Sequence, residues 1–584
     1  MKKLISNFKR SALTLLVASL ASLTAFAQNK TVTGTITDNT GQALIGVNVQ
    51  ETARPTNGTI TNVDGKFSLQ VADNASLTLS YVGFKTQVLS VRGKTQFRIT
   101  MQENAESLNE VVVVGYGSQK KVNLTGAVAQ LDSKALADRP LQNVSSGLQG
   151  LMPGVTVMSG QGRPGQDGAT IRVRGVGTLN TSDPYILIDG VESGTMDAVD
   201  PNDIASISVL KDAASAAIYG SKAANGVILI TTKRGTTGKP RISYNGYAGM
   251  QEATHMIDRM GSAEYATDLN LALEAGGYSP RFTDEDIQKF KDGSDPYGHP
   301  NTNWYDLAYR TGFQTQHNVS ATGGTEQVKY MASAGILHQD GILPNSNRNQ
   351  INARTNIDLK LHRRLTAHLS MAFIKNDYKD ANSAYAGGSS DQIIRQLNLI
   401  APWIPYKNAD GSYGTVSDGS PMAWLDSGMT VDRNNRNFTG TLSADYEILD
   451  GLKATLSGSY VTNRQQYKNF EDFIQYNPNK ASQPASLDER YYLWDRTNFD
   501  ALLNYDKTFA GKHNLKVLAG WHTEDYNYSY AKMYRSSFPN NDLTDINAGD
   551  ASTQTNEGYT RELAMISWFG RVNYDYAGNE TDYN

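Results

Sequence analysis

The stretch Phe438-Thr-Gly-Thr-Leu-Ser-Ala-Asp-Tyr-Glu-Ile448 alternates without a break between apolar or small residues and polar ones. The turn Asp450-Gly451 follows, and Ala454-Thr-Leu-Ser-Gly-Ser-Tyr460 repeats the alternation. Successive side chains of a β-strand point to opposite faces of its sheet, so a period of two residues predicts strands with one apolar and one polar face. We therefore expect an antiparallel hairpin here.

The same pattern recurs through residues 236–584, where roughly ten strands can be counted. It is clear in Ile357–Leu361 with Leu365–Phe373, in Phe499–Tyr505 with Leu515–Trp521, and in Ile566–Tyr576. One apolar and one polar face per strand fits either a soluble sandwich or a transmembrane barrel. The membrane interpretation is favoured by aromatic strand ends and by tight turns that alternate with long polar stretches, namely 376–437 and 521–561.

The first 27 residues have the pattern of a secretory signal peptide. Lys2 and Lys3 precede a nearly uninterrupted apolar run, Ala12–Leu23, and Ala25-Phe-Ala27 offers small residues at the cleavage site. A transmembrane anchor is the alternative, but this run is too short to span a bilayer comfortably. No other apolar run of about 18 residues occurs, so any membrane crossing must use β-strands.

Composition narrows the function classes. The formal net charge is −4 with no long basic run, so we expect no nucleic-acid partner. There is no cysteine, which excludes disulfides, thiolate zinc sites, a cysteine nucleophile and a lipid-modified N-terminal Cys. All six Trp lie beyond residue 300, and only four of the 31 Tyr precede residue 235, so the chain changes character near residue 235. Aromatic enrichment at a water–lipid boundary is one physical cause of such asymmetry.

Residues 31–103 predict a small antiparallel sandwich. Val32, Gly34 and Ile36 alternate with threonines, and Asp64-Gly65 is a hairpin turn signal. Together with Tyr81-Val-Gly-Phe84 the pattern resembles the carboxypeptidase regulatory-like domain. That resemblance implies an accessory binding or spacing module rather than a peptidase. The segment has no His-Glu pair to hold zinc.

Residues 122–235 contain short strand-like runs, with short helices expected at 143–151 and 213–219. Arg174-Gly-Val-Gly177, Pro184–Val191 and Leu210–Lys233 closely resemble the plug domain of SusC/RagA-type TonB-dependent outer-membrane transporters. We therefore expect a mainly β protein with an N-terminal β-sandwich, an α+β plug domain and an incomplete transmembrane β-barrel. About 10 of some 22 barrel strands would be present, so the chain would stop near mid-barrel and be part of a longer protein. The expected domains are a signal peptide (1–27), the sandwich (31–103), a TonB box region (109–121), the plug (122–235) and the N-terminal part of the barrel (236–584).

The segment Glu110-Val-Val-Val-Val-Gly-Tyr-Gly117 carries the candidate binding site. Four β-branched residues favour an extended backbone, and the glycines end the strand. In isolation an ordinary buried strand is the simpler interpretation. Its place between an exported sandwich and a plug instead predicts a segment that a partner adds as a strand to its own sheet. The stretch resembles the TonB box of that family, which implies that the TonB-binding residues are Glu110, Val111, Val112, Val113, Val114 and Gly115.

The resemblance implies active import across the outer membrane. TonB, driven by the inner-membrane proton gradient through ExbB and ExbD, would pull the plug, and a SusD-like surface lipoprotein would close the barrel mouth. The expected cargo is a glycan or oligopeptide, and the expected surroundings are outer-membrane lipid. Siderophore or cobalamin import is the alternative within this class, and a non-transporting, glycan-binding surface adhesin is the alternative outside it.

No catalytic, cofactor or metal site is predicted. No Ser-His-Asp or paired-carboxylate constellation can be argued from spacing, and the glycine motifs lack the third glycine of a dinucleotide fingerprint. Three acidic loops (284–286, 292–295 and 540–545) could hold calcium but lack the spacing of a calcium-binding helix-loop-helix, so solvated loops are expected. The cargo site is not predicted, although aromatic residues expected in loops could stack on sugars or pack on peptides: Trp403, Tyr413, Trp424, Tyr491, Tyr492 and Trp494.

Overall fold

The computed structural model describes residues 29–38, 41–81, 84–102, 111–113, 116–120, 127–132, 139, 141–385 and 388–576. The predicted signal peptide lies outside these residues, as do Glu110, Val114 and Gly115. The chain divides into two compact units: Met1–Val112 with Ser118–Leu124, and Val113–Gly117 with Thr125–Asn584.

The first unit is a two-sheet sandwich, as the alternation near its start predicts. One sheet has the order β4-β1-β7 and the other β3-β2-β5-β6. Apolar residues of both sheets, among them Ile36, Val49 and Leu77, form its core. The strands are β1 (Asn29–Thr37), β2 (Asn48–Glu51), β3 (Arg54–Ile60), β4 (Lys66–Ala72), β5 (Ser76–Ser80), β6 (Gln87–Ser90) and β7 (Gln96–Thr100).

The second unit begins with a small domain, residues 127–232, called the plug from here on. Its five-stranded sheet has the order β10-β15-β16-β13-β14, and β11 pairs with β12 beside it. The core gathers β-branched and aliphatic residues such as Val144, Ile207 and Ile228. The elements are β10 (Val128–Asp132), α4 (Val144–Gly147), β11 (Val155–Ser159), β12 (Ala169–Val173), β13 (Tyr185–Ile188), β14 (Val191–Glu192), β15 (Ile204–Leu210), α5 (Ala213–Ala216) and β16 (Val227–Thr232).

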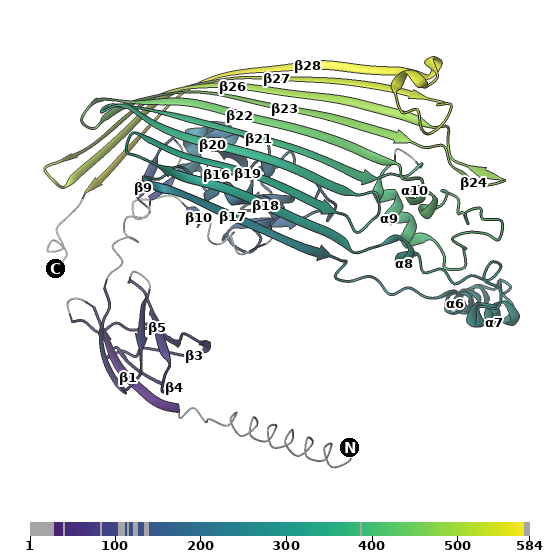
Figure 1. Cartoon of the computed structure of the whole chain (residues 1–584), viewed down its shortest axis with the longest axis horizontal. Helices are drawn as coiled ribbons and strands as arrows, with labels where there is room; N and C mark the ends of the chain where they lie inside the picture. Colours follow the sequence, from purple (N-terminus) through teal and green to yellow (C-terminus); the bar gives the residue numbers. More distant parts are fainter. Residues whose placement is uncertain are drawn as a thin grey trace, which may run out of the picture. The chain divides into compact units, whose positions relative to one another are not determined.

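A ten-stranded antiparallel sheet, called the wall, makes up most of the second unit (Figure 1). Its strands follow chain order, and short turns at one end alternate with long connections at the other. The strands are β17 (Gly238–Gln251), β18 (Gly312–Gly324), β19 (Val328–Asp340), β20 (Asn347–His362), β21 (Leu365–Ala381), β22 (Thr430–Leu449), β23 (Leu452–Glu471), β26 (Ser486–Phe509), β27 (His513–Ser536) and β28 (Thr555–Tyr576).

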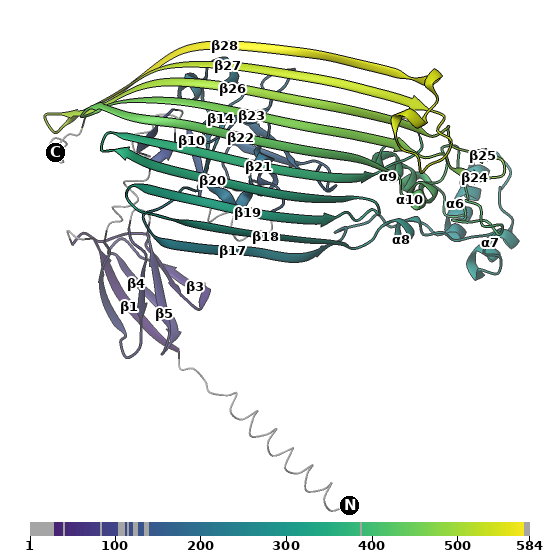
Figure 2. The ribbon, with the colours of Figure 1, turned by 45° about the horizontal axis from the view of Figure 1, so that its top comes forward.

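The long connections carry the helices and a small hairpin. Figures 1 and 2 place α8, α9 and α10 at the end of the wall away from the short turns, while the plug lies against one face of the wall. These elements are α6 (Ser262–Ala275), α7 (Asp284–Asp292), α8 (Trp304–Ala308), α9 (Ser390–Leu399), α10 (Pro421–Ser427), β24 (Gln475–Asn477) and β25 (Lys480–Ala481). No helix within the described ranges is long and apolar enough to cross a membrane.

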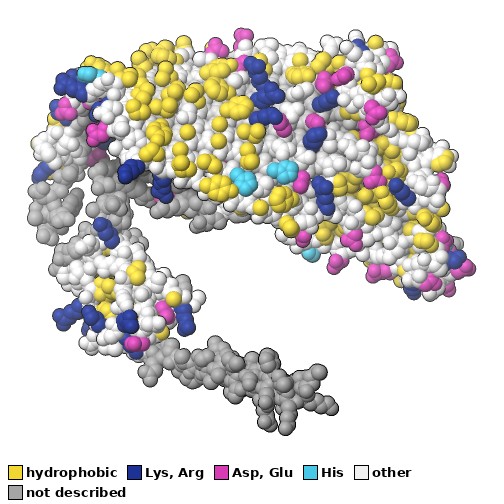
Figure 3. Space-filling view, viewed as in Figure 1, with side chains coloured by type: hydrophobic (Ala, Val, Ile, Leu, Met, Phe, Trp, Pro, Cys, Tyr) yellow, Lys and Arg dark blue, Asp and Glu magenta, His cyan; other side chains and the backbone are white. Residues whose placement is uncertain are grey.

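The wall reverses the usual burial pattern of a soluble protein. Its apolar face is exposed: Leu442, Ile566 and Trp568 are 62%, 67% and 80% accessible. Its opposite face carries buried polar side chains, such as Arg354 and Asn356, which lie toward the plug. Figure 3 shows hydrophobic side chains gathered on the outer face near the short turns, and charged ones toward the long connections. An apolar exterior with a polar interior is typical of a membrane barrel and not of a sandwich.

Several expected element boundaries are wrong. The polar stretches 376–437 and 521–561 are shorter as connections than expected, because β21 runs on to Ala381 and β27 to Ser536. Backbone hydrogen bonds between neighbouring wall strands continue beyond the apolar residues of the outer face. In that part of a strand, both faces can be polar. In the plug, α4 spans only four residues, and α5 passes into a 3₁₀ segment broken at Gly220, whose φ is +61°.

Candidate functional site: the seam between plug and wall

A tight turn in the plug positions the first carboxylate of the seam. Asp189 and Gly190 join β13 to β14, and both have positive φ values (+50° and +84°), as the Asp-Gly turn signal predicts. The Asp189 carboxylate accepts hydrogen bonds from the backbone nitrogen and the hydroxyl of Thr232, at 2.9 and 2.6 Å. These bonds fix the side chain at the end of β16, facing the wall.

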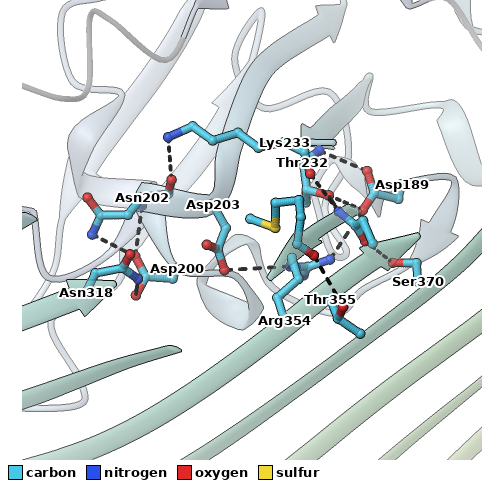
Figure 4. Close-up of polar contacts among 12 residues, drawn as sticks. Asp189, Asp200, Asn202, Asp203, Thr232, Lys233, Asn318, Arg354, Thr355 and Ser370 are labelled. Carbon is cyan, nitrogen blue, oxygen red and sulfur yellow. Dashed lines mark hydrogen bonds and ion pairs between the residues drawn. The ribbon is translucent and has the colours of Figure 1, made fainter. Parts of the chain in front are cut away.

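Arg354 of strand β20 enters the plug at this turn (Figure 4). Its Nη1 lies 3.3 Å from Asp189 Oδ2, and its Nε lies 3.7 Å from Asp203 Oδ2. All three side chains are less than a tenth exposed. Burial raises the pKa of Asp203 to about 6, and the neighbouring Asp200 carboxylate acts in the same direction. One guanidinium therefore serves two buried carboxylates.

Amide side chains of the wall complete this part of the seam. Asn356 Nδ2 donates to Lys233 O at 2.7 Å and to Thr232 Oγ1 at 3.0 Å. Farther along, Asn318 Nδ2 donates to Asp200 Oδ2 at 3.3 Å. Figure 4 shows Asn318 of β18 and Arg354 of β20 reaching the plug, from two wall strands that β19 separates. The wall thus satisfies backbone and side-chain groups of the plug that would otherwise be buried unpaired.

A second group of charges lies where the plug meets β26 and β27. Lys222 Nζ bridges Glu192 of the plug at 2.8 Å and Glu524 of the wall at 2.7 Å. Arg496 of the wall lies 2.7 Å from Glu192 and 3.6 Å from Glu524. The four groups carry two positive and two negative charges, so their formal charges balance one another.

A third group joins the plug segment 143–168 to strands β20 and β21. Arg163 Nη1 lies 2.7 Å from Asp380 Oδ2, and Gln166 Nε2 donates to the same oxygen at 3.1 Å. Arg348 Nη1 donates to Asn143 Oδ1 at 2.9 Å. All three groups of contacts therefore pair plug residues with wall residues through charges and hydrogen bonds.

The polar character of the seam determines how it can separate. Breaking apolar contacts exposes surface to water at about 25 cal/mol per Å². Separating charged pairs lets both partners recover their hydration, which offsets most of the lost attraction. A cavity of about 30 Å³ between the Asp189 turn and wall strands β20 to β23 is lined by polar groups on both sides, and this volume suits one or two waters. The seam therefore pairs plug and wall through specific polar contacts rather than through buried apolar surface.

The predicted TonB-binding segment falls only partly within the described residues. Val111–Val113 forms strand β8, which pairs with β9 (Ser118–Lys120) in a two-stranded sheet. A two-stranded sheet is marginally stable on its own, and each of its strands keeps one outer edge. Between these two strands in the chain, the ring of Tyr116 stacks on Phe569 of β28, with centroids 4.6 Å apart. Tyr116 and Phe569 both belong to the second unit.

Sequence reasoning missed the seam. The only local signal was polar residues at every second position of wall strands, such as Asn352, Arg354 and Asn356. Their partners lie more than a hundred residues away in the chain, as with Asp189 and Arg354. Of the acidic loops, residues 284–286 begin helix α7, where Asp286 forms a capping box with Thr283.

The aromatic residues expected in loops divide into three groups. Trp424 is 1% exposed and donates to Tyr476 Oη at 2.7 Å, so it belongs to a core. Trp403 packs edge-on against Tyr265, and Tyr413 Oη donates to Asp426 at 2.9 Å. The remaining three were expected in a loop but lie within strand β26: Tyr491, Tyr492 and Trp494.

Comparison with known proteins shows which class of protein has this architecture. Residues 120–227 match the TonB-dependent Receptor Plug Domain, and residues 32–113 match the CarboxypepD_reg-like domain. The RagAB peptide importer in its open-open state superposes with a TM-score of 0.68 at 24% identity, over 80% of this chain and 55% of that one. A sandwich, a plug and a polar-lined strand wall thus define the fold of a TonB-dependent receptor.

Sequence identity supports the same class of receptor. The chain is 33% identical to the TonB-dependent receptor P3 of Formosa agariphila over 94% of its length, and 30% identical to the TonB-dependent receptor SusC of Bacteroides thetaiotaomicron over 98%. These matches cover 53% and 57% of the two relatives, so the chain spans about half the length of the curated relatives it matches. Over most of its length the chain is thus similar to SusC-like TonB-dependent receptors, and receptors of this type are outer-membrane β-barrel proteins.

Proposed function

We propose that this chain is the plug-bearing part of a TonB-dependent importer that carries a glycan or an oligopeptide across the outer membrane. The observation that supports this proposal is the seam. The plug meets the wall through paired charges and amides, which water can hydrate when they separate and which can pair again. A permanently closed barrel would have no need of a polar seam, since apolar packing would hold it more firmly. The family relationship supplies the source of force, and we assign the chain no catalytic activity.

The force would enter at Glu110–Gly115. In this proposal TonB, energised through ExbB and ExbD, pairs with the edge of Val111–Val114 by strand addition. Residues 1–27 would be removed during export, which leaves the sandwich and this segment in the periplasm. Because β8 lies in a sheet of only two strands, it is open to a further strand at its outer edge. Tension would then pass through Tyr116 to the plug.

Cargo and partner are proposed from named relatives. SusC belongs to this family by sequence, and the RagAB structure is titled a peptide importer. We accordingly propose a SusD-like surface lipoprotein as the partner over the long connections of the wall. A glycan or oligopeptide cargo is preferred to a siderophore or cobalamin, because the match to SusC spans 98% of this chain, whereas the ferric enterobactin receptor PirA and the rhizobactin receptor match 23% and 29% of it.

Energised uptake tests the proposal against an adhesin. Cells that express the native protein are given radiolabelled oligosaccharides and peptides, with and without a protonophore. Import predicts accumulation that the protonophore abolishes, while surface binding at 4 °C persists. Accumulation that is identical with and without the protonophore would refute TonB-dependent import and favour a surface-binding protein.

A further inference from the structure

Three cations form a row on the outer face of the wall, in the half of the strands nearer the long connections. Lys375 of β21 is directly paired with Arg436 of β22, and Arg436 with Arg464 of β23. Side chains an even number of residues apart share one face of a strand, so Lys375 lies on the face of Phe373. Arg464 likewise lies on the face of Tyr460, and both aromatic rings are exposed on the outer side. Figure 3 shows Lys and Arg side chains in a line across this face. Lys375, Arg436 and Arg464 are called the cation row from here on.

The cation row lies at one edge of the apolar band of the outer face. From Arg436 to Ile448, β22 advances twelve residues, which is about 40 Å along the strand and, at a tilt of about 40°, about 30 Å across the membrane. The outward side chains between these two residues are apolar or small: Phe438, Gly440, Leu442, Ala444 and Tyr446. On the other side of the row, Asp377 and Asn434 face outward and are polar. An apolar band of about 25 Å is typical of a membrane barrel, so the row lies at the level of the lipid head groups.

Neither arginine of the cation row is neutralised by the described part of the chain. Arg436 and Arg464 make no hydrogen bond or ion pair with any described residue. Two carboxylates of the same face are already engaged. Asp377 lies 2.5 Å from the lysine of the row, and Asp495 accepts a hydrogen bond from Tyr460 Oη at 2.7 Å. Like charges directly opposite one another destabilise a sheet, so the pair of arginines is unfavourable unless an anion lies between them.

We propose that the cation row binds the phosphate of a membrane lipid in the leaflet next to the long connections. Directly paired residues have Cβ atoms about 4.5–5.5 Å apart, so the guanidinium groups of Arg436 and Arg464 both reach one phosphate. Each guanidinium presents its N–H donors in a planar fork that matches two phosphate oxygens. Lys375 adds a third positive charge from the next strand.

A lipid matches this surface better than a soluble anion or an acidic protein segment does. Phe438 and Leu442 lie on the hydrocarbon side of the row, where the acyl chains of the bound lipid would pack on them. A soluble phosphate or an acidic protein would contact the row alone, and exposed charge pairs contribute little in water. The phosphate of a lipid is already held at this level by its own acyl chains, so its binding costs less translational freedom.

Retention of a phosphorylated lipid by the purified native receptor tests the proposal. The receptor is prepared in an uncharged detergent and titrated with lipid A, a glycolipid with two phosphate groups. Native mass spectrometry measures the fraction of receptor that carries the lipid. The double variant Arg436→Gln/Arg464→Gln should lower that fraction about fivefold at equal lipid concentration. Arg363→Gln/Arg364→Gln removes two neighbouring exposed cations at the short turn after β20 and is the matched control, which should retain lipid like the unmodified receptor.

Two further measurements separate a lipid phosphate from a free one. Lipid A from which both phosphates have been removed should bind the unmodified receptor no better than lipid A binds the double variant. Thermal unfolding is the second readout, because a ligand that binds only the folded state raises Tm. Lipid A should raise the Tm of the unmodified receptor and of the control by more than that of the double variant, while inorganic phosphate alone should leave all three unchanged.

Three results would overturn the proposal: equal retention of lipid A by the double variant and the control, equal retention of the two lipids by the unmodified receptor, or a rise in Tm with inorganic phosphate as large as that with lipid A. The last result would indicate a site for soluble anions instead. Heat-modifiable migration on gels verifies that each variant is a folded barrel. None of these measurements depends on TonB or on uptake, so their outcome is separate from that of the import experiment.

Discussion

At the scale of single residues, Arg354 shows how one cation of the seam holds two buried carboxylates. It reaches Asp189 and Asp203 together, in a region where neither carboxylate has access to bulk water. Removing one partner of a buried charge group leaves the others uncompensated, which costs far more than the group contributes when intact. The turn that presents Asp189 was predictable from Asp189-Gly190, but its partner was not, since nothing local links residue 189 to residue 354.

Replacing Arg354 by methionine should loosen the plug. The Arg354→Met variant keeps the length of the side chain and leaves Asp189 and Asp203 without their cation, so docking of the plug should weaken by roughly 3–5 kcal/mol. Hydrogen exchange of strands β13 and β16 measures this as faster amide exchange. Arg363→Met, at the exposed turn that ends the same strand, is the control and should leave the exchange rates unchanged.

The raised pKa of Asp203 predicts a pH dependence of plug docking. An acid whose pKa rises from its usual 3.8 to about 6 on burial binds a proton more tightly in the docked plug than in the released plug. Docking is therefore strongest below about pH 4, weakens as the pH rises toward 6, and is constant above that, with a total change of roughly 3 kcal/mol. Asp203→Asn should remove this dependence.

The pH dependence of plug docking can be measured as the protease resistance of the plug between pH 4 and pH 7.5. Asp183→Asn, at an exposed carboxylate elsewhere in the plug, should behave like the unmodified protein. A wild-type profile that is flat between pH 4 and pH 6 would show that Asp203 does not ionise in this range.

At the scale of elements, the alternation at 438–460 predicted strands β22 and β23, and both occur with Asp450-Gly451 between them. What could not be predicted is where each strand ends. The alternation of apolar residues stops with the lipid band, but backbone pairing continues into water, so β26 and β27 reach 24 residues each. Likewise α9 and α10 depend on packing against one another and α8, a tertiary effect absent from local periodicity.

The position of an outward-facing residue relative to the apolar band should determine whether the wall tolerates a charged side chain there. Leu442 lies within the apolar band, so Leu442→Arg should cost about 2–4 kcal/mol and reduce the amount of folded protein in the outer membrane. Tyr491 faces the same way but lies near the long connections, so Tyr491→Arg should be tolerated. Quantitative immunoblots of outer-membrane fractions make the comparison; equal loss in both variants would argue against a lipid-facing band.

At the scale of the whole molecule, we propose that a plug fixed to the membrane wall by polar contacts is pulled from one segment. The family and the general fold could be predicted from the plug motifs and the strand pattern. The seam could not be predicted, because its contacts join the plug to the wall. The sequence patterns of these two regions are local and say nothing about how one meets the other. The role of Glu110–Gly115 stays a prediction from its sequence and position.

Tethering the plug should stop import. Thr232 of the plug and Asn356 of the wall are hydrogen-bonded at 3.0 Å, and this chain contains no cysteine, so a Thr232→Cys/Asn356→Cys pair can be linked selectively. The oxidised pair should bind cargo but import at background level, and a reductant should restore uptake. Each single cysteine variant serves as the control. Full uptake by a quantitatively linked protein would show that this part of the plug does not separate from the wall.

The most direct measurement is energised uptake by a variant that lacks Glu110–Gly115. The account predicts that this variant inserts into the outer membrane and binds cargo at the cell surface as the unmodified protein does, while accumulation inside the cell falls to the level seen with a protonophore. Uptake at the unmodified rate, with normal insertion and binding, would contradict the claim that import is driven through this segment.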